Sequence, residues 1–379
     1  MAFVVLVLAG LLMRSFTALQ QIDPGFQADG VLALQMSLPR AKYDSPAKLA
    51  GFYHELQSRT ATLPGVQRAA AVYPLPMSGD GWSGSFIVEE LPLAPGQPEP
   101  HAEYAVALPG YFRTLKIPLR AGREFTDQDK EGAPEVVVVD ELLARRYWPG
   151  KKALGRRINL IGREEGVWAE VVGVAAHVRN AGPQEEGEPQ IYMPFLQRPQ
   201  SQLYMVACCA ADPAAFSPAL RREVRGLDAD QPITKLAPLR QIVDRALARQ
   251  RFNLLLVTLF AGVALALAAV GLYGVMSGLV AQRVNEIGIR LALGGRPIDA
   301  LRLILGEGMT VVLGGLLIGL PGAVLLSRVA TDLLFSTATT DPVTYGAIAA
   351  LVALVSLAAT YIPARRATRV DPLVALRDP

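Results

Sequence analysis

The sequence is poor in cysteine, in histidine and in charged side chains. Its 379 residues include two cysteines and three histidines, which is too few for a disulfide scaffold or a cysteine-rich metal site. Lys and Arg number 37 against 34 Asp and Glu, a formal net charge of +3. This near balance argues against a strongly basic surface, so we expect no nucleic acid among the partners.

Catalytic motifs are also missing or incomplete. Residues 81–85 (GWSGS) approach the hydrolase motif G-x-S-x-G, but Ser85 stands in place of the last glycine. Residues 54–58 approach H-E-x-x-H, but Ser58 stands where the second zinc ligand belongs. The nucleotide-binding motif G-x-x-x-x-G-K-[ST] does not occur. We therefore expect no catalytic, cofactor-binding or metal-binding residue, and no ATP hydrolysis by this chain.

Two smaller features leave a chemical alternative open. His101 and His177 have no spacing that supports a triad, although a triad using one of them stays an alternative. Cys208 and Cys209 are adjacent, and neighbouring side chains of a strand point to opposite faces, so a disulfide between them is disfavoured. We interpret them as small apolar residues, with a redox role as the alternative.

Acidic and basic residues are absent from three long apolar runs, at residues 252–282, 308–327 and 342–364. A bilayer core needs about 20 helical residues, so each run predicts a transmembrane helix. Buried core helices of a water-soluble fold are the alternative. The runs also hold no histidine, which argues against a proton relay or an ion channel.

A shorter apolar run opens the chain at residues 1–13 and ends at Arg14. We interpret it as a transmembrane helix, within residues 1–20, whose beginning is missing from this sequence. The alternatives are a short complete anchor and a signal peptide.

Arginine placement orients the predicted spans. Four arginines lie within residues 283–307 and four within residues 365–379, whereas the loop between the last two spans has only Arg328, beside Asp332 and Asp341. The positive-inside rule then places residues 283–307 and 365–379 in the cytoplasm. Residues 15–251 fall outside the cell membrane, which in a bacterium means the periplasm or its equivalent.

The external part, residues 21–250, is predicted to be an α+β domain. Strand patterns at 31–38 and 66–73 flank a helical pattern at 46–63, and the same order recurs as a strand at 202–210, a helix at 213–226 and a strand at 232–236. Such units suggest a split ferredoxin-like sheet, interrupted by an inserted mixed subdomain at about residues 82–195. A further helix at 239–250 is expected to lead into the membrane domain, residues 251–379.

Residues 283–295 are predicted to form a short amphipathic segment after the span at 252–282. Val284, Ile287 and Leu291 make an apolar stripe, and Glu286 precedes Arg290 by four residues. A stripe of this kind on a cytoplasmic surface can lie on lipid or dock into a partner's groove. In the neighbouring spans, Gly274 with Gly278 and Gly315 with Gly319 have the spacing of close helix packing.

Residues 273–295 and the closing run 361–377 (YIPARRATRVDPLVALR) resemble the signatures of the MacB/FtsX-type ABC transporter permeases. Residues 63–66, 111–115, 122–126 and 171–174 are similar to that family's periplasmic core domain. Residues 10–16 and 23–26 look like the middle of its long, internally duplicated members. The resemblance covers nearly the whole chain.

The resemblance implies a permease subunit of the inner membrane that transmits the motion of a separate ATPase to a periplasmic domain, for export of a drug, peptide or other amphiphile. ATP and Mg would bind in that partner and not in this chain. The family's ATPase-coupling segment corresponds here to Glu286, Ile287, Gly288, Ile289, Arg290, Leu291, Ala292, Leu293 and Gly294. Further implied partners are membrane lipid, a second permease copy or half and a periplasmic adaptor.

Two other functions remain as alternatives. The first is a related mechanotransmitter that extracts lipoproteins or activates a cell-wall hydrolase. The second belongs to a different class, a membrane-anchored periplasmic hydrolase or sensor.

Overall fold

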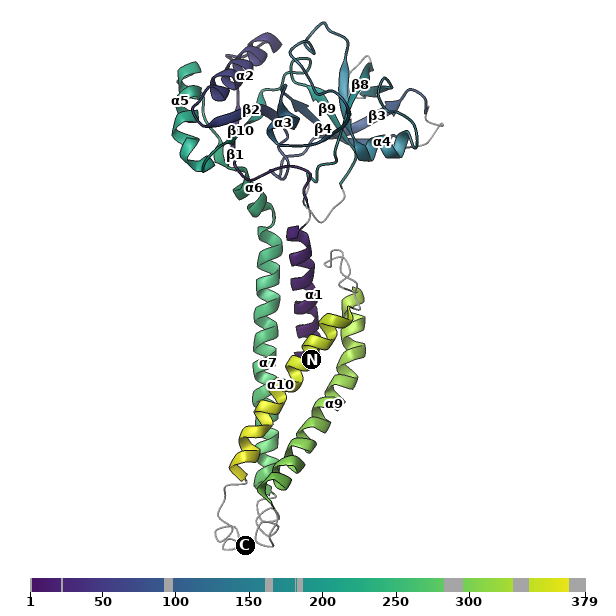
Figure 1. The fold of residues 1–379 in the computed structure, drawn as a ribbon, viewed down its shortest axis with the longest axis vertical. Coiled ribbons are helices and arrows are strands. Elements are labelled where there is room, and N and C mark those ends of the chain that lie inside the picture. Colours follow the sequence, from purple (N-terminus) through teal and green to yellow (C-terminus); the bar gives the residue numbers. More distant parts are fainter. Residues whose placement is uncertain are drawn as a thin grey trace. The chain divides into compact units, whose positions relative to one another are not determined.

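The computed structural model describes residues 2–21, 23–91, 98–160, 166–180, 182, 187–282, 296–329 and 341–367. The chain forms two compact units (Figure 1). One is Ile22–Ala248, called the head below. The other combines Met1–Gln21 with Arg249–Pro379 and is called the membrane unit.

The head is an α+β unit built around paired strands. Its strands are β1 Val31–Ser37, β2 Val66–Tyr73, β3 Ser83–Val88, β4 His101–Ala107, β5 Leu119–Gly122, β6 Val136–Asp140, β7 Arg157–Leu160, β8 Val167–Ala175, β9 Gln190–Pro194, β10 Gln202–Cys209 and β11 Lys235–Pro238. Its helices are α2 Pro46–Ala61, α3 Tyr111–Thr114, α4 Glu141–Tyr147, α5 Ser217–Leu227 and α6 Leu239–Ala246, with a 3-10 turn η1 at Pro213–Phe216.

Strands from the beginning and the end of the head sequence alternate in a four-stranded antiparallel part of the sheet. The strand order there is β11-β1-β10-β2. β1 pairs antiparallel with both β10 and β11, and β10 pairs antiparallel with β2. The strands joined by α2 are therefore parallel to each other and separated by β10. The strands joined by η1 and α5 have the same relation across β1.

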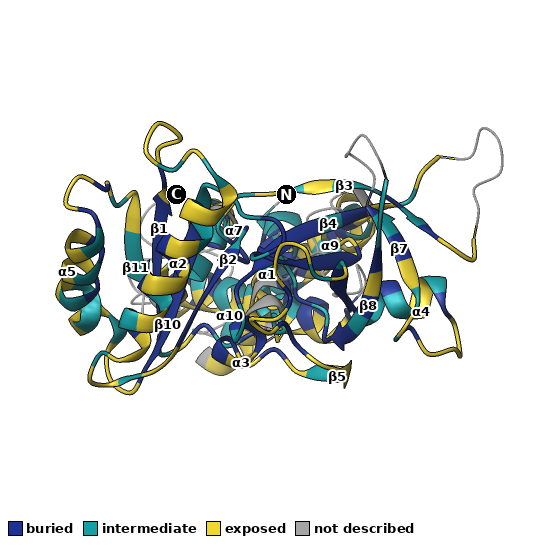
Figure 2. Ribbon diagram, turned by 90° about the horizontal axis from the view of Figure 1, so that it is seen from above, coloured by how far each residue is buried: buried dark blue, intermediate teal, exposed yellow. Residues whose placement is uncertain are grey.

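Both faces of this four-stranded part are covered, which explains why β1 is buried along almost its whole length. Leu32, Leu34 and Met36 pack in one core cluster with residues of α2 and α5. Val31 and Ala33 face the opposite way, into a second cluster with residues of α3 and α6. Figure 2 shows the central strands as buried and the outer faces of α2 and α5 as exposed.

Six strands between β2 and β10 form a ring, while β5 lies outside it and pairs with β8. β3 pairs with β4 and β7, β8 pairs with β7 and β6, and β9 pairs with both β6 and β4. The pairings β4–β9 and β6–β8 are parallel and the others are antiparallel, so this inserted part is mixed. Ring closure leaves these strands without a free edge, which protects them from pairing with other chains.

Several predicted boundaries differ from the structure, two of them for a clear physical reason. The strand predicted at 232–236 is β11, Lys235–Pro238, because the register with β1 begins only where Lys235 meets Gln35. Pro232 has no N–H to donate to a strand ladder. The helix predicted at 239–250 is divided at Leu247, where α6 ends and α7 follows at Ala248.

The membrane unit consists, among the described residues, of α1 Ala2–Gln21, α7 Ala248–Gln282, α9 Pro297–Val329 and α10 Pro342–Ala367. Three stretches are long and apolar enough to cross a membrane: Arg251–Gln282, Leu301–Arg328 and Pro342–Arg365. They contain the three runs predicted from the sequence. In α1 the apolar stretch is Ala2–Ser15.

Helices α1, α9 and α10 pack against one another. Phe3, Val7 and Leu11 of α1 are buried in a cluster with Ala323 and Tyr345. At the end of α1's apolar stretch, an Arg14 guanidinium nitrogen lies 2.5 Å from an Asp341 carboxylate oxygen. The same oxygen accepts from the Thr344 backbone N–H at 2.9 Å and so caps α10.

Candidate functional site

The predicted ATPase-coupling residues, 286–294, lie outside the residues that the structure describes. The two helices that flank them are described: α7 ends at Gln282 and α9 begins at Pro297. The coupling assignment therefore stays a prediction.

The four glycines predicted for helix packing lie on α7 and α9. A side-chain carbon placed on Gly319 would lie 3.0 Å from the Phe3 ring of α1, so helix α1 approaches α9 closely there. A carbon placed on Gly274, Gly278 or Gly315 would meet no atom within 4 Å. Close packing at these three glycines stays a prediction, and it would need a neighbour other than the described part of this chain.

The residues that imitate catalytic motifs do not assemble a complete site among the described residues. Ser85 Oγ lies 3.4 Å from His101 Nε2 across β3 and β4, but no described carboxylate contacts that imidazole. His54 Nε2 lies 3.6 Å from Asp127 Oδ1, and both side chains are exposed. Over the described ranges, no group of histidine, cysteine and carboxylate side chains could hold a metal ion.

His177 and the cysteine pair are built into the fold. His177 Nδ1 lies 2.5 Å from an Asp140 carboxylate oxygen, and Asp140 is fully buried and also caps α4. Cys208 and Cys209 are both buried and free of disulfides. Burial raises the pKa of the Cys209 thiol to about 11, so this group stays a thiol at neutral pH.

Three segments quoted above for the family resemblance are linked by contacts in the head. The Arg113 guanidinium forms an ion pair with Glu124, and the Phe112 ring lies 6.1 Å from the Phe125 ring. These contacts join residues 111–115 to residues 122–126, which follow after residues 116–121.

Two glycines allow the third segment to approach. Gly122 has a φ of +73°, and a side-chain carbon there would lie 2.2 Å from the Val172 carbonyl oxygen. A carbon on Gly173 would lie 2.3 Å from the Arg123 carbonyl oxygen. Only glycine fits at these contacts between backbones. The two glycines therefore allow the backbone of residues 122–126 to pack directly against that of residues 171–174.

Arg123 and Asp129 close the turn that follows β5. Two guanidinium nitrogens of Arg123 donate to the two carboxylate oxygens of Asp129, at 2.7 and 2.9 Å. Burial acts to raise the pKa of Asp129, but the hydrogen bonds from Arg123 and from the Thr126 backbone N–H outweigh it and lower that pKa. The carboxylate is therefore ionised and fixed at neutral pH.

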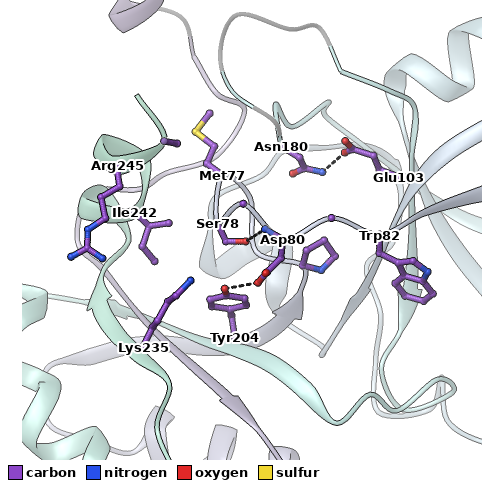
Figure 3. A pocket seen from close by; sticks show the side chains of 14 residues that line it. Met77, Ser78, Asp80, Trp82, Glu103, Asn180, Tyr204, Lys235, Ile242 and Arg245 are labelled. Carbon is purple, nitrogen blue, oxygen red and sulfur yellow. Dashed lines mark hydrogen bonds between the residues drawn. The ribbon is translucent and has the colours of Figure 1, made fainter. Parts of the chain in front are cut away.

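A cavity of about 600 Å³ lies in the head where the four-stranded part meets the ring (Figure 3). One wall is the loop after β2, which includes Met77, Asp80 and Trp82. β4 and β10 contribute Glu103 and Tyr204. The remaining wall is formed by Lys235 of β11 with Ile242 and Arg245 of α6.

Neutral donors hold both carboxylates of this cavity. Asp80 accepts from the Tyr204 hydroxyl at 2.6 Å and from the Gln35 side-chain amide at 3.2 Å. Glu103 accepts from the side-chain amides of Asn180 at 2.6 Å and Gln190 at 3.3 Å. Burial and the hydrogen bond to Asp80 raise the pKa of Tyr204, which keeps the hydroxyl protonated as the donor.

Sequence patterns did not single out the charged residues of the cavity. Asp80 and Glu103 come from different segments of the chain, and Lys235 and Arg245 follow more than 100 residues later. The only signal is the concentration of glycine and proline in residues 74–84, which predicts a loop. The imitation motif at 81–85 is divided between that loop and β3.

Two family profiles together match nearly the whole sequence. The profile of the MacB-like periplasmic core domain matches residues 2–226, and that of the FtsX-like permease C-terminal domain matches residues 258–372. The chain belongs to the MacB/FtsX-type permease family. This permease is a multi-pass protein of the bacterial inner membrane with a large periplasmic domain, in agreement with the predicted spans.

Curated relatives have names that refer to export. The permease is 29% identical over 284 residues to the probable syringafactin export ATP-binding/permease protein of Pseudomonas syringae, with 70% of this chain and 40% of that protein covered. It is 28% identical to the macrolide export ATP-binding/permease protein of Sodalis glossinidius, with 70% and 42% covered. The permease thus spans less than half the length of these relatives.

A pyoverdine export ATP-binding/permease protein of Pseudomonas aeruginosa is 27% identical, with 83% of this chain and 46% of that protein covered. Among solved structures, the periplasmic region of MacB from Actinobacillus actinomycetemcomitans is similar with a TM-score of 0.40 and 13% identity. The similarity covers 58% of this chain and 94% of that one.

Proposed function

We propose that the permease works with a separate ABC ATPase and transmits that subunit's nucleotide-driven motion across the membrane to the periplasmic head, for export of a drug, peptide or other amphiphile. The observation that carries this proposal is the FtsX-like match over residues 258–372, which includes the whole segment between α7 and α9. The 379 residues hold no nucleotide-binding motif, so under this proposal ATP would be hydrolysed outside them.

The proposed path begins at residues 286–294. Their apolar stripe would dock into a groove of the ATPase, and closure of two ATPase subunits would move it. The adjoining helices α7 and α9, 35 and 33 residues long, would carry the displacement outward as rigid rods. Two permease copies or halves would be needed to present two docking segments to an ATPase pair.

The head is proposed to be the part that acts on the exported molecule. Its strand order β11-β1-β10-β2, with parallel strands joined by helical crossovers, supports the split ferredoxin-like assignment for the four-stranded part. The ring of β3, β4, β6, β7, β8 and β9 would then be the inserted subdomain.

The experiment is co-purification of the permease with its ATPase, followed by measurement of ATPase activity in a reconstituted bilayer. Leu291→Asp places a charge in the docking stripe, and burying an unpaired charge at an interface costs about 2–5 kcal/mol, so coupling should fall by at least about tenfold. Glu286→Ala should weaken coupling less.

Leu291→Ile is the matched control, because it keeps the stripe apolar and should couple normally. If the Leu291→Asp variant still assembles with the ATPase and stimulates it like the unmodified permease, the docking segment has been assigned wrongly.

A further inference from the structure

The cavity of Figure 3 holds four charged side chains that do not neutralise one another. Two are cations, Lys235 and Arg245, and two are carboxylates, Asp80 and Glu103. Within the described part of the chain none of the four forms an ion pair within 4.0 Å. Opposite charges are thus kept apart around an open space, where contact between them would be favourable.

The charges are also sorted in space. Lys235 and Arg245 lie with Ile242 on the side formed by β11 and α6, whereas Glu103 lies with Asn180 and Trp82 on the other side (Figure 3). Asp80 lies between them, fixed by Tyr204. Lys235 and Arg245 are exposed, so their ammonium and guanidinium groups can meet a ligand without crossing packed atoms.

The carboxylates are oriented in advance. Each is held through one oxygen by two neutral donors, which fix its direction and leave its negative charge uncompensated. Buried donors that already hold a charged acceptor reduce the ordering cost of binding a cationic group there. The sorted charges favour one orientation of a ligand and reject the reverse orientation.

Apolar surface fills the space between the charges. Trp82, Met77 and Ile242 line the cavity, and Trp82 is only partly buried, so part of its ring is free to contact a ligand. A cavity of about 600 Å³ lies within the range that binds small molecules.

We propose that this cavity binds an amphiphile that carries both an anionic and a cationic group, with the anion at Lys235 and Arg245, the cation at Asp80 and Glu103, and an apolar part against Trp82 and Ile242. That this ligand is the exported molecule rests on the function proposed above; binding itself does not. The proposal thus specifies a binding site within one copy of the head and the charge pattern of its ligand.

The test uses the full chain in lipid nanodiscs, without nucleotide or ATPase, and three probes titrated by calorimetry. The probes are the tripeptide Leu-Leu-Leu, its C-terminal amide and its N-acetyl form, which have both charges, only the cation and only the anion. Empty nanodiscs correct for binding to lipid.

With the unmodified chain, amidation should weaken binding about tenfold, since it removes a charge-assisted contact. With the double variant Lys235→Gln and Arg245→Gln, the tripeptide should bind about as weakly as its amide, and amidation should then make less than about a twofold difference. Arg222→Gln on α5, an exposed cation outside the cavity, should leave the preference unchanged.

Acetylation should weaken binding to the unmodified chain similarly, and Glu103→Gln should reduce that sensitivity while its amide oxygen still accepts from Asn180. The proposal is overturned if no tripeptide binds, if all three bind equally, or if the double variant keeps its preference for the free carboxylate. Because Lys235 and Arg245 are exposed, loss of folding is not expected to obscure the result.

The two proposals fail separately. A permease that stimulates its ATPase but shows no charge-dependent binding would support the coupling proposal and contradict the proposed binding site. A permease that binds the zwitterionic tripeptide in the predicted way but associates with no ATPase would support the binding site and contradict the proposed transport function.

Discussion

The head and the membrane unit treat their apolar side chains in opposite ways. Leu32 and Leu34 of β1 are fully buried, whereas Leu317 and Ile318 of α9 are 72% and 80% exposed. In the span within α7, only 6% of the most apolar window is buried inside the chain. In water such surface would be costly, but lipid tails are as apolar as leucine.

This difference shows where each unit gets its stability. The head is held by burial, by paired backbones and by fixed polar contacts such as Arg123 with Asp129. The membrane helices satisfy their backbones internally, and α1, α9 and α10 contact one another through a small apolar cluster and the ion pair of Arg14 with Asp341. The exposed faces of α7 and α9 are available to lipid or to a second permease copy.

The largest effect should come from truncating matched leucines in the two units. Leu32→Ala removes a fully buried side chain from the head core and should lower the free energy of unfolding by about 2–5 kcal/mol. Leu317→Ala removes one that faces outward and should change it by less than about 0.5 kcal/mol. Thermal unfolding of the full chain in nanodiscs measures both, and an equal loss for Leu317→Ala would show that this face of α9 is packed against another chain.

A smaller effect is expected from adding one carbon to matched glycines. Gly173→Ala places that carbon 2.3 Å from the Arg123 carbonyl oxygen, and overpacking of this kind should cost the head about 1–3 kcal/mol. Gly315→Ala meets no atom within 4 Å, so the single chain should not be destabilised.

Gly315→Ala can also be tested by a second measurement, the fraction of permease that forms dimers. If Gly315 packs against a second permease copy, Gly315→Ala should reduce the dimer fraction in native mass spectrometry while leaving the unfolding temperature of the head unchanged. A normal dimer fraction would remove Gly315 from the proposed interface.

A last effect, similar in size, concerns a fixed ion pair of the head. Asp129→Asn should cost about 1–3 kcal/mol at pH 7, because it weakens the paired contact with Arg123. The pKa of Asp129 is lowered by folding, so its stabilisation is complete above about pH 4, the usual aspartate pKa, and is lost as the pH falls through the lower folded value.

The loss of unfolding free energy caused by Asp129→Asn, measured by chemical unfolding, should therefore become smaller below about pH 4. Asp127→Asn is the control, because its exposed carboxylate is two residues away and, among the described residues, its ion-pair contact is the one to His54 at 3.6 Å. A deficit for Asp129→Asn that is the same at pH 7 and pH 3 would contradict the assigned ionisation.

What the sequence by itself determined is local. Three charge-free runs predicted the spans, because crossing a bilayer depends on the length and polarity of one continuous segment. The strand at 31–38 was predicted as β1 for the same reason, since alternation is a property of neighbouring residues. The burial of β1 on both faces was not predicted, because it depends on α3 and α6 packing from elsewhere in the chain.

Only the tertiary structure decided the sites. Gly122 and Gly173 lie in segments that resemble the family, but their need to be glycine arises only where two distant backbones meet. The four charges of the cavity come from the loop after β2, from β4, from β11 and from α6. They gather because the chain returns through β10 and β11 to pair with its own beginning, and no spacing along a sequence encodes a distance between such segments.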